Sequence, residues 1–450
     1  MRGLVMSSEW VEVTFDELKA STRQSFAMGP FGSRIKAENF VTKGVPVIKG
    51  GNLNGNFLLE DNFDYLTEEK AEELSSSIAL PLDLVITHRG TIGQVGIIPE
   101  SSRYPKYVVS QSQLKLSFDQ SKVSPYFIYY FLRSPEGQRR LLTNASQVGV
   151  PAIAQALTST RAISLSLPHL SEQRAIVNVL LTLDNRIEHN HALAANLEAI
   201  ARRLFKSWFV DFDPVRAKAA GEKPPGLADD IAALFPDRFV ESELGEVPEG
   251  WRLETLASVA RLNPEAWTTR KHPDEIHYLD LSNVKDGIIE APTRFSWEEA
   301  PSRARRVLEQ GDTIIGTVRP GNRSFALIDQ TWLTGSTGFA VLRPASNAER
   351  EYLYLASTSD DAIERLAHLA DGAAYPAVRP EVVLATEAII TGKKIMTAFS
   401  SVIKGMIDRA SVCKQEANVL AAIRDLLLPR LISGKLRVED AESIIEEVIA

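Results

Sequence analysis

Residue patterns that support catalysis occur in this sequence only as fragments. A nucleotide-binding loop needs Gly-x-x-x-x-Gly-Lys-Ser/Thr to present backbone amides to phosphates. Gly392-Lys393 and Gly434-Lys435 lack both the upstream glycine and the hydroxyl that should follow the lysine. The acidic-Pro-Pro-aromatic signature of adenine methyltransferases has its nearest fragment at 211–215, which lacks the second proline and the stacking ring. Neither nucleotide hydrolysis nor methyl transfer is therefore expected in this chain.

Metal-assisted and nucleophilic chemistry find no better support. Glu68-Glu69-Lys70 supplies only the end of a nuclease motif, with no Pro-Asp before it at a useful distance, and is typical of a solvated helix. His189 and His191 are two residues apart and point away from each other on a helix. The single cysteine, Cys413, excludes cysteine-based zinc modules and internal disulfides. We expect no catalytic residue, metal or cofactor in this chain.

Side chains that recognise nucleic acids are present on predicted loops. A turn-forming stretch, 29–33, contains two glycines and a proline that let the backbone approach a surface, and basic residues follow it. Gln and Arg make bidentate contacts to adenine and guanine edges. In the first half the candidate DNA contacts are Arg34, Lys36, Lys49, His88, Arg89, Thr91, Gln94, Gln111 and Gln113. In the second half they are Arg303, Arg305, Arg306, Arg319, Arg323, Ser336 and Thr337. The alternative is that these are ordinary solvated loop residues.

The charge balance limits how such a surface could bind DNA. The 450 residues carry a formal net charge of −8, and no segment is strongly basic. Because DNA-binding proteins normally show a basic footprint, contact must depend on local clusters or on partner subunits. The arginines at 303–306 and the pair Arg319 and Arg323 concentrate positive charge in an otherwise acidic region.

The elements that must position these side chains occur twice. The extended run 45–53 is matched by 276–284, which places Asn52 over Asn283. In 83–90 and 312–321, an acidic turn residue precedes an apolar strand that ends in Arg and then Gly. Two further blocks share one offset. They are 127–141 over 352–366 and Pro151-Ala152-Ile153 over Pro376-Ala377-Val378. A shared offset across separated blocks indicates an internal duplication.

Each copy ends in a long helix with a narrow apolar seam. Steps of three and four residues are typical of a helix that packs along one partner. The packing residues are Ile176, Leu180, Leu183, Ile187, Leu197, Leu204 and Trp208 in the first helix, and Val402, Met406, Leu420 and Leu427 in the second. At about 1.5 Å per residue the first helix would extend roughly 55–60 Å. We expect the two helices to pair antiparallel; the alternative is that each packs on its own domain.

The chain is therefore predicted to be an α+β protein with an internal pseudo-twofold repeat. Two mixed α/β domains are separated by two long antiparallel, coiled-coil-like helices. The expected boundaries are a first domain at 1–170, a helix at 171–212, an ordered connector at 213–250, a second domain at 251–392, a helix at 393–434 and a C-terminal tail at 435–450. Neither a membrane span nor a signal peptide is evident, so a cytoplasmic location is expected.

The sequence resembles the specificity (S) subunits of type I restriction–modification systems. The resemblance covers nearly the whole chain and is strongest in the long, aromatic-rich central run Leu204-Phe205-Lys206-Ser207-Trp208-Phe209-Val210-Asp211-Phe212-Asp213-Pro214-Val215-Arg216-Ala217-Lys218. Three further stretches match. They are 234–251, Gly29-Pro30-Phe31-Gly32-Ser33, and Leu427-Leu428-Pro429-Arg430-Leu431-Ile432-Ser433-Gly434-Lys435-Leu436.

This resemblance implies a division of labour among subunits. Members of the family carry two target recognition domains, each specific for one half of a split double-stranded DNA sequence. Two long helices hold the domains apart and dock the modification (methyltransferase) subunits, of which two are expected. Those subunits methylate adenine with S-adenosylmethionine, and restriction subunits cut DNA using ATP and Mg. The chain itself would be non-catalytic.

The second copy departs from the first, which implies an asymmetric DNA target. It lacks the Gly-Pro-Phe-Gly-Ser loop and has Leu262-Asn263-Pro264-Glu265 near its start. Its helix is also poorer in large apolar residues, with Cys413 on the seam. Two other functions remain open at this point. One is a protein scaffold that uses the paired helices without DNA, and the other is an enzyme with a cryptic nuclease or methyltransferase site.

Overall fold

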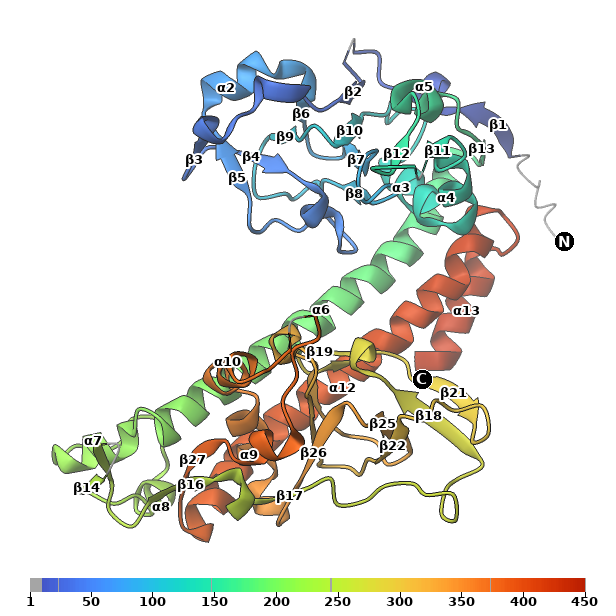
Figure 1. Ribbon diagram of the computed structural model, residues 1–450. Coiled ribbons are helices and arrows are strands. Elements are labelled where there is room, and N and C mark those ends of the chain that lie inside the picture. The colour runs from blue at the N-terminus through green and yellow to red at the C-terminus, as the bar shows by residue number, and fades with distance from the viewer. Residues whose placement is uncertain (1–9, 23, 147, 243–244, 373, 450) are drawn as a thin grey trace, which may run out of the picture. The chain divides into compact units, whose positions relative to one another are not determined.

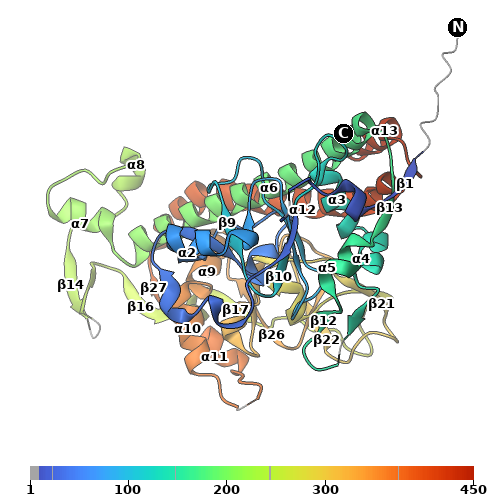
Figure 2. The ribbon, with the colours of Figure 1, turned by 90° about the horizontal axis from the view of Figure 1, so that it is seen from above.

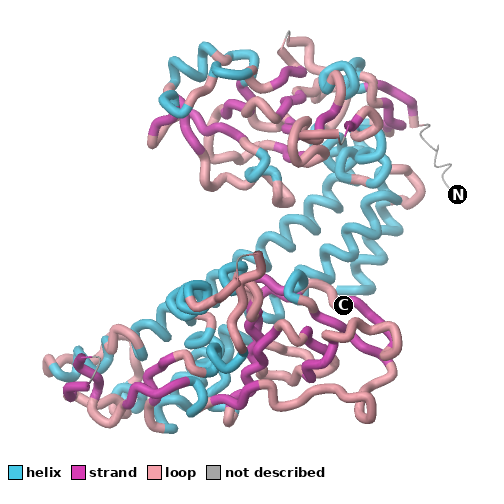
Figure 3. The backbone as a smooth tube through the Cα atoms, viewed as in Figure 1, coloured by secondary structure: helices cyan, strands magenta, loops and turns pink. Residues whose placement is uncertain are grey.

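The computed structural model describes residues 10–22, 24–146, 148–242, 245–372 and 374–449. The chain divides into two compact units (Figure 1). Unit 1 comprises 1–186 with 420–450, and unit 2 comprises 187–419. Short strands joined by long loops dominate both units outside the long helices (Figure 3).

Unit 1 contains two principal sheets. The first is fully antiparallel, in the order β2-β10-β7-β8. Its strands are β2 (Phe26–Met28), β10 (Gln113–Leu116), β7 (Leu84–Thr87) and β8 (Val95–Ile97). The second has the order β3-β5-β4-β9-β6, with β4 and β9 parallel. Its strands are β3 (Phe40–Val41), β5 (Asp64–Leu66), β4 (Val45–Ile48), β9 (Tyr107–Val109) and β6 (Ile78–Ala79). The runs at 45–48 and 84–87 are buried on both faces, which explains why they lack polar alternation.

Shorter elements complete the globular part of unit 1. Strand pairs β1 (Val11–Thr14) with β13 (Ser164–Leu167) and β11 (Ala145–Ser146) with β12 (Ala152–Ile153) are antiparallel. The α-helices are α1 (Phe15–Leu18), α2 (Glu68–Glu73), α3 (Pro125–Arg133), α4 (Pro135–Leu141) and α5 (Ala156–Arg161). The 3-10 turns are η1 (Gly32–Arg34), η2 (Ala37–Asn39), η3 (Gly50–Leu53) and η4 (Ser75–Ser77).

The globular part of unit 2 is built on a four-stranded antiparallel sheet and a second, mixed sheet. The order of the first is β17-β26-β23-β24, with strands β17 (Ala260–Leu262), β26 (Phe339–Pro344), β23 (Thr313–Gly316) and β24 (Phe325–Leu327). The order of the second is β21-β18-β25-β22, with strands β21 (Thr293–Ser296), β18 (Glu275–Leu279), β25 (Leu333–Ser336) and β22 (Ala304–Val307). The remaining strands are β16 (Arg252–Thr255), β27 (Glu387–Ile390), β19 (Val284–Lys285) and β20 (Ile288–Ile289). Its short helices are η5 (Leu256–Ser258), η6 (Leu281–Asn283), η7 (Pro320–Asn322), η8 (Asn347–Glu349), α9 (Arg350–Ser357), α10 (Asp360–His368) and α11 (Pro380–Leu384).

The internal duplication is confirmed by strand order. The sheet β2-β10-β7-β8 has the same connectivity as β17-β26-β23-β24, and β5-β4-β9-β6 has that of β21-β18-β25-β22. In each second sheet the central pair is parallel, β4 with β9 and β18 with β25. The aligned Asn52 and Asn283 make equivalent hydrogen bonds, because the side chain of each accepts the backbone N–H of the residue three positions earlier. Asn52 accepts from Lys49 at 2.9 Å, and Asn283 accepts from Asp280 at 3.0 Å.

The hydrogen bonds of the turns after β7 and β23 show which of their residues correspond. Arg89 and Arg319 each follow a strand. However, Gly90 N–H donates to Pro151 O at 2.8 Å, and Arg319 N–H donates to the matching Pro376 O at 2.7 Å. Arg319 therefore occupies the place of Gly90. Both have positive φ, +89° for the glycine and +49° for the arginine.

The two long helices are α6 (Leu170–Phe209) and α12 (Lys393–Ile432), and they pair antiparallel as predicted. In unit 2, Asn190 donates to Glu416 at 3.2 Å, and Phe399 lies against Trp208 with ring centroids 5.3 Å apart. In unit 1, Arg424 of α12 contacts Asp184 of α6 at 2.7 Å. Partners with increasing numbers on α6 have decreasing numbers on α12, which is the antiparallel arrangement.

The predicted seam is correct for most of α6 and needs correction on α12. Ile176, Leu180, Leu183, Ile187, Trp208, Leu420 and Leu427 are buried, whereas Leu197 and Leu204 are partly buried. Val402 and Met406 are also only partly buried, because the seam runs through their neighbours Ile403 and Ile407. Phe399 sets this register, since it is fully buried and lies four residues before Ile403.

The connector carries its own elements. Helices α7 (Asp213–Ala219) and α8 (Asp229–Ala232) and the hairpin β14 (Phe239–Ser242)–β15 (Gly245–Pro248) lie grouped in Figure 2. Phe235 docks on Trp208 with ring centroids 4.9 Å apart, so the aromatic central motif forms part of the core of unit 2. Glu243 and Leu244 lie outside the described residues. The predicted C-terminal tail is instead mostly the helix α13 (Val438–Ile449), whose Ala441 is buried.

Candidate nucleic-acid interface

In unit 1 the candidate side chains gather at one edge of its two sheets. Thr87 ends β7 opposite Gln113, which begins β10, and Ser110 N–H after β9 donates to Ile48 O at the end of β4. Strand direction thus brings the ends of β7, β4 and β9 and the start of β10 together. Lys49, Gln111 and Gln113 line a pocket at this edge with residues of the 29–33 turn, including Pro30 and Gly32. His88 and Arg89 line a second pocket with Val150 and Gln155.

An internal polar chain organises this edge. The Gln113 amide donates to Thr87 Oγ1 at 3.2 Å, and the Thr87 hydroxyl donates to Gln94 Oε1 at 3.0 Å. Gln94 Nε2 in turn donates to the Gly50 carbonyl at 3.2 Å, which fixes the turn η3. Gln113 is 1% exposed. Gln113 was predicted to contact DNA, but the structure buries it and uses its amide to hold the turn.

His88 is another buried member of the set. Its ring is 7% exposed, and Nε2 lies 3.2 Å from the Gln111 carbonyl. Burial lowers the pKa of His88, so the ring is neutral at pH 7 and offers no cation to a phosphate. The Gln111 side chain, by contrast, is exposed, as are those of Arg89 and Thr91.

The basic residues near the 29–33 turn have protein partners but remain accessible. Arg34 Nη2 donates to the Glu73 carbonyl at 2.9 Å, and Lys36 Nζ lies 3.5 Å from Glu38. Lys49 forms an ion pair with Asp64 and is about half exposed. Surface pairs of this kind are weak and can exchange for phosphate at little cost. The turn itself packs inward at Gly29, where a Cβ would lie 1.8 Å from Ser110 O, so this glycine serves the fold and not a ligand.

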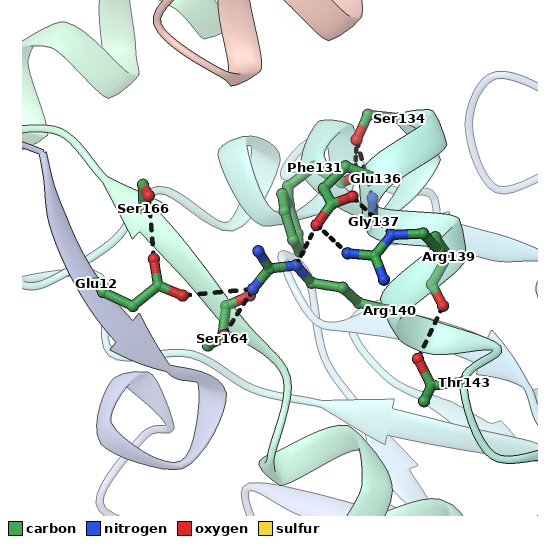
Figure 4. Close-up of polar contacts among 10 residues, drawn as sticks. All are labelled: Glu12, Phe131, Ser134, Glu136, Gly137, Arg139, Arg140, Thr143, Ser164 and Ser166. Carbon is green, nitrogen blue, oxygen red and sulfur yellow. Dashed lines mark hydrogen bonds and ion pairs between the residues drawn. The ribbon is translucent and has the colours of Figure 1, made fainter.

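Two other arginines of unit 1 belong to a polar network around Glu136 (Figure 4). Arg140 Nη1 donates to the carbonyl and hydroxyl oxygens of Ser164, each at 2.6 Å, and pairs with Glu12 at 3.4 Å. Arg139 and Arg140 both donate to Glu136, and these bonds lower the pKa of Glu136 to about 2. Arg140 thus fastens α4 to the strand pair β1–β13, whereas Arg139 pairs with Glu136 of the same helix and is 68% exposed.

In unit 2 two of the predicted contacts are committed to the fold. Ser336 is fully buried and its hydroxyl accepts the Gly338 N–H at 3.2 Å, so it is not available to DNA. Arg323 bridges Asp286 and Asp360, the latter at 2.8 Å, and is neutralised. Thr337, next to Ser336, is exposed.

The 303–306 arginines differ among themselves. Arg303 is 64% exposed and lies 3.7 Å from Asp280. Arg306 is partly buried, burial lowers its pKa, and its Nε has no hydrogen-bond partner among the described residues. Arg305 stacks over Trp297, with Cζ 4.5 Å from the ring centroid. His272 also stacks on Trp297, with centroids 4.0 Å apart and planes 4° from parallel.

Three aromatic or imidazole side chains at this surface were missed by the sequence analysis. They are Trp297, whose ring contacts Arg305, His272, which stacks on Trp297, and Tyr375, which is 71% exposed and lies under Arg319. Their partners are distant in sequence, so no spacing rule could have paired them. The sequence offered only a weaker signal for these residues, which is that single aromatic residues occur in loops near clustered basic residues.

Among the described residues, no three His, Cys, Asp or Glu side chains come together in a way that could hold a metal ion. Within the same part of the chain, no helix is both long and apolar enough to cross a membrane.

Comparison with known proteins shows which proteins this chain is similar to. Residues 30–199 match the model of the type I restriction modification DNA specificity domain. The type I restriction enzyme HindI specificity subunit of Haemophilus influenzae is 24% identical over 405 residues, which cover 77% of this chain and 87% of that protein. The MjaIX specificity subunit of Methanocaldococcus jannaschii is 21% identical over 381 residues, covering 83% and 82%.

A solved structure agrees in fold. The type-I restriction-modification system S subunit from M. genitalium matches with a TM-score of 0.59 at 16% identity, over 95% of this chain and 97% of that one. The resemblance inferred from the sequence is thus confirmed. The chain is similar to the specificity subunits of type I restriction–modification systems.

Proposed function

We propose that this chain recognises a bipartite, asymmetric DNA sequence and positions methyltransferase and restriction subunits on it. The proposal assigns one half-site to each target recognition domain, 1–170 and 251–392. The helices at 171–212 and 393–434 would act as spacers, the segment 213–250 as their connector, and 435–450 as the C-terminal segment.

One observation carries this proposal: the two domains share a strand order but present different side chains at the same edge. The internal chain of Thr87, Gln94 and Gln113 has no counterpart in the second copy, where Gly316 occupies the place of Thr87 at the end of the matching strand. The second copy instead carries Arg319 where the first has Gly90. Recognition of two different half-sites requires different side chains on the same fold, because contacts to the bases determine specificity.

The residues proposed to touch DNA are those that the structure leaves accessible. In the first domain they are Arg34, Lys36, Lys49, Arg89, Thr91 and Gln111, with Gln94 partly exposed behind them. In the second they are Arg303, Arg319 and Thr337, which are exposed, and Arg305, which is partly exposed. Such a small set of basic residues on an acidic chain leaves much of the phosphate contact to partner subunits.

Catalysis is assigned to those partners. In this proposal two modification subunits bring S-adenosylmethionine and methylate adenine, and restriction subunits bring ATP and Mg and cut DNA. The chain would act in the cytoplasm, where the chromosome is accessible, and would hold no cofactor itself. Binding energy from this chain then selects the site, and chemistry follows elsewhere.

Co-expression with the modification subunits tests the proposal. We expect methylation-aware sequencing of the host to show methylated adenine in one split, non-palindromic motif. A complex that assembles but neither binds duplex DNA nor methylates any motif would instead identify a protein scaffold, and nuclease or methyltransferase activity of the isolated chain would identify an enzyme.

The spacer role has a separate test. An insertion of about four residues near Ala194 adds roughly one turn to the first helix. We expect the non-specific gap between the two half-sites to lengthen while both half-sites keep their sequence. A methylated motif with an unchanged gap would contradict the spacer assignment.

A further inference from the structure

Arg319 and Tyr375 form an exposed stacked pair in unit 2. Arg319 lies in the turn after β23, and Tyr375 lies in the loop before α11. The Arg319 Cζ atom is 4.7 Å from the centroid of the Tyr375 ring, and Arg319 Nη2 donates to the Ala374 carbonyl at 2.8 Å. Tyr375 is 71% exposed, which is unusual for a large aromatic side chain with no apolar cover. The pair therefore presents a held guanidinium to solvent.

The backbone around the pair is well braced. Arg319 N–H donates to Pro376 O at 2.7 Å, and Asp371 and Ala377 exchange two backbone hydrogen bonds at 2.9 and 3.1 Å across the base of the loop. Arg319 has a φ of +49°, a left-handed conformation that a side chain rarely adopts. The first copy places Gly90 there, so the fold does not need a side chain at this position. Non-glycine residues in such conformations gather at functional sites.

The donors of Arg319 remain largely available. The bond to Ala374 uses one of the two Nη2 hydrogens. The other Nη2 hydrogen stays free in either case. Together with a hydrogen on Nε or on Nη1, it forms an edge with two donors. No carboxylate pairs with Arg319 among the described residues, whereas Arg323 and Arg343 of the same unit are each held by two or more. Arg319 thus keeps both its charge and a planar donor fork.

We propose that Arg319 recognises a guanine in the half-site of the second domain, with Tyr375 as the residue that positions its guanidinium. This inference rests on the proposed function. Contact with the face of the Tyr375 ring and the hydrogen bond to Ala374 O restrict where the guanidinium can lie. Its planar two-donor edge matches the O6 and N7 acceptors of guanine in the major groove. A phosphate contact needs no such restriction, since phosphate is contacted from many directions.

The corresponding place in the first domain cannot make this contact. Gly90 replaces Arg319, and the position matching Tyr375 is Val150, which precedes Pro151 as Tyr375 precedes Pro376. The guanine contact is therefore specific to one half of the target, which adds a concrete source of asymmetry.

Four variants test the pair in the complex with its modification subunits. Arg319→Lys keeps the charge and removes the fork, Tyr375→Ala removes the ring, and Tyr375→Phe keeps the ring. Arg294→Lys is the matched control, because Arg294 is an exposed arginine on β21 of the same unit. The readouts are the methylated motif of the host and duplex affinity for sites in which one base pair is changed at a time. Subunit assembly is checked by size-exclusion chromatography.

We expect Arg319→Lys and Tyr375→Ala to lower the preference for one G·C pair about tenfold or more, since a bidentate pair discriminates by that order. The other half-site should stay intact, and Tyr375→Phe and Arg294→Lys should keep the wild-type motif. A uniform loss of affinity with an unchanged motif would show a phosphate contact and overturn the inference, as would no change at all. If the wild-type complex recognises no motif, the proposed function fails first and this inference falls with it.

Discussion

The guanidinium of Arg424 on α12 contacts the carboxylate of Asp184 on α6 at 2.7 Å, inside unit 1. Asp184 is 1% exposed and also accepts the Tyr130 hydroxyl at 2.7 Å. Burial and the neighbouring carboxylate both raise the pKa of Tyr130, which therefore stays a donor. This buried charged contact joins the two helices and helps to fix which residues of α6 and α12 face each other.

Removing the arginine should be costly because it leaves a buried, uncompensated carboxylate. We expect Arg424→Met to lower the free energy of unfolding by about 3 kcal/mol, measured by urea denaturation. The matched control is Arg409→Met on the same helix, whose pair with Glu416 is about half exposed and should contribute less than about 0.5 kcal/mol. Asp184→Asn in the Arg424→Met background should recover part of the loss. Equal effects at Arg424 and Arg409 would contradict a special role for the buried pair.

His88 should make folding stability depend on pH. Burial lowers its pKa in the folded state below the value of 6.5 that applies to an exposed ring. As pH falls below about 6.5, the unfolded chain takes up the proton first, so stability should fall by up to about 1.4 kcal/mol per pH unit until the folded pKa is reached. Urea midpoints at pH 7.5 and 5.5 measure the slope. His88→Gln should flatten this component, and an identical slope in the variant would show that other groups cause it.

Much of the architecture was predictable because its sequence pattern occurs in two copies. The duplication, the long helices and the central aromatic motif appear in the sequence as repeated apolar patterns. The spacing of buried residues can be read from the linear sequence. The individual contacts were less accessible. Gln113 and Ser336 are of residue types that often contact DNA, but on their strands both side chains point into the core. The sequence alone does not give that orientation.

Residues one position apart are hard to distinguish from the sequence alone. Arg89 and Arg319 are each an arginine after a strand, yet the hydrogen bonds to Pro151 O and Pro376 O align Arg319 with Gly90. Likewise, a step of three or four residues fits both Val402 and Ile403 until Phe399 anchors the register. Tyr375 and Trp297 could not be found because their partners come from other segments of the chain.

The corrected seam on α12 can be tested directly. Ile403 is fully buried, whereas its neighbour Val402 is only partly buried. We expect Ile403→Ala to lower the free energy of unfolding by about 2–5 kcal/mol, and Val402→Ala by about 1 kcal/mol or less. Thermal and urea unfolding of the two variants gives the comparison. A larger loss at Val402 would restore the register predicted from the sequence.

Arg305 offers the cleanest test of a phosphate contact in the second domain. Arg305 and Arg306 are both partly buried, but the Arg305 guanidinium lies over the face of Trp297, whereas burial lowers the pKa of Arg306. A charge reversal at Arg306 would therefore disturb folding more. We expect Arg305→Glu to weaken duplex binding by the assembled complex about equally for all sequences. The slope of log affinity against log salt concentration should fall by about 1, because one fewer phosphate is neutralised. Arg305→Lys should retain most of the affinity, since it keeps the charge. Unchanged binding and salt slope in Arg305→Glu, with normal subunit assembly, would remove Arg305 from the interface. A change confined to one base pair would instead make Arg305 a base contact.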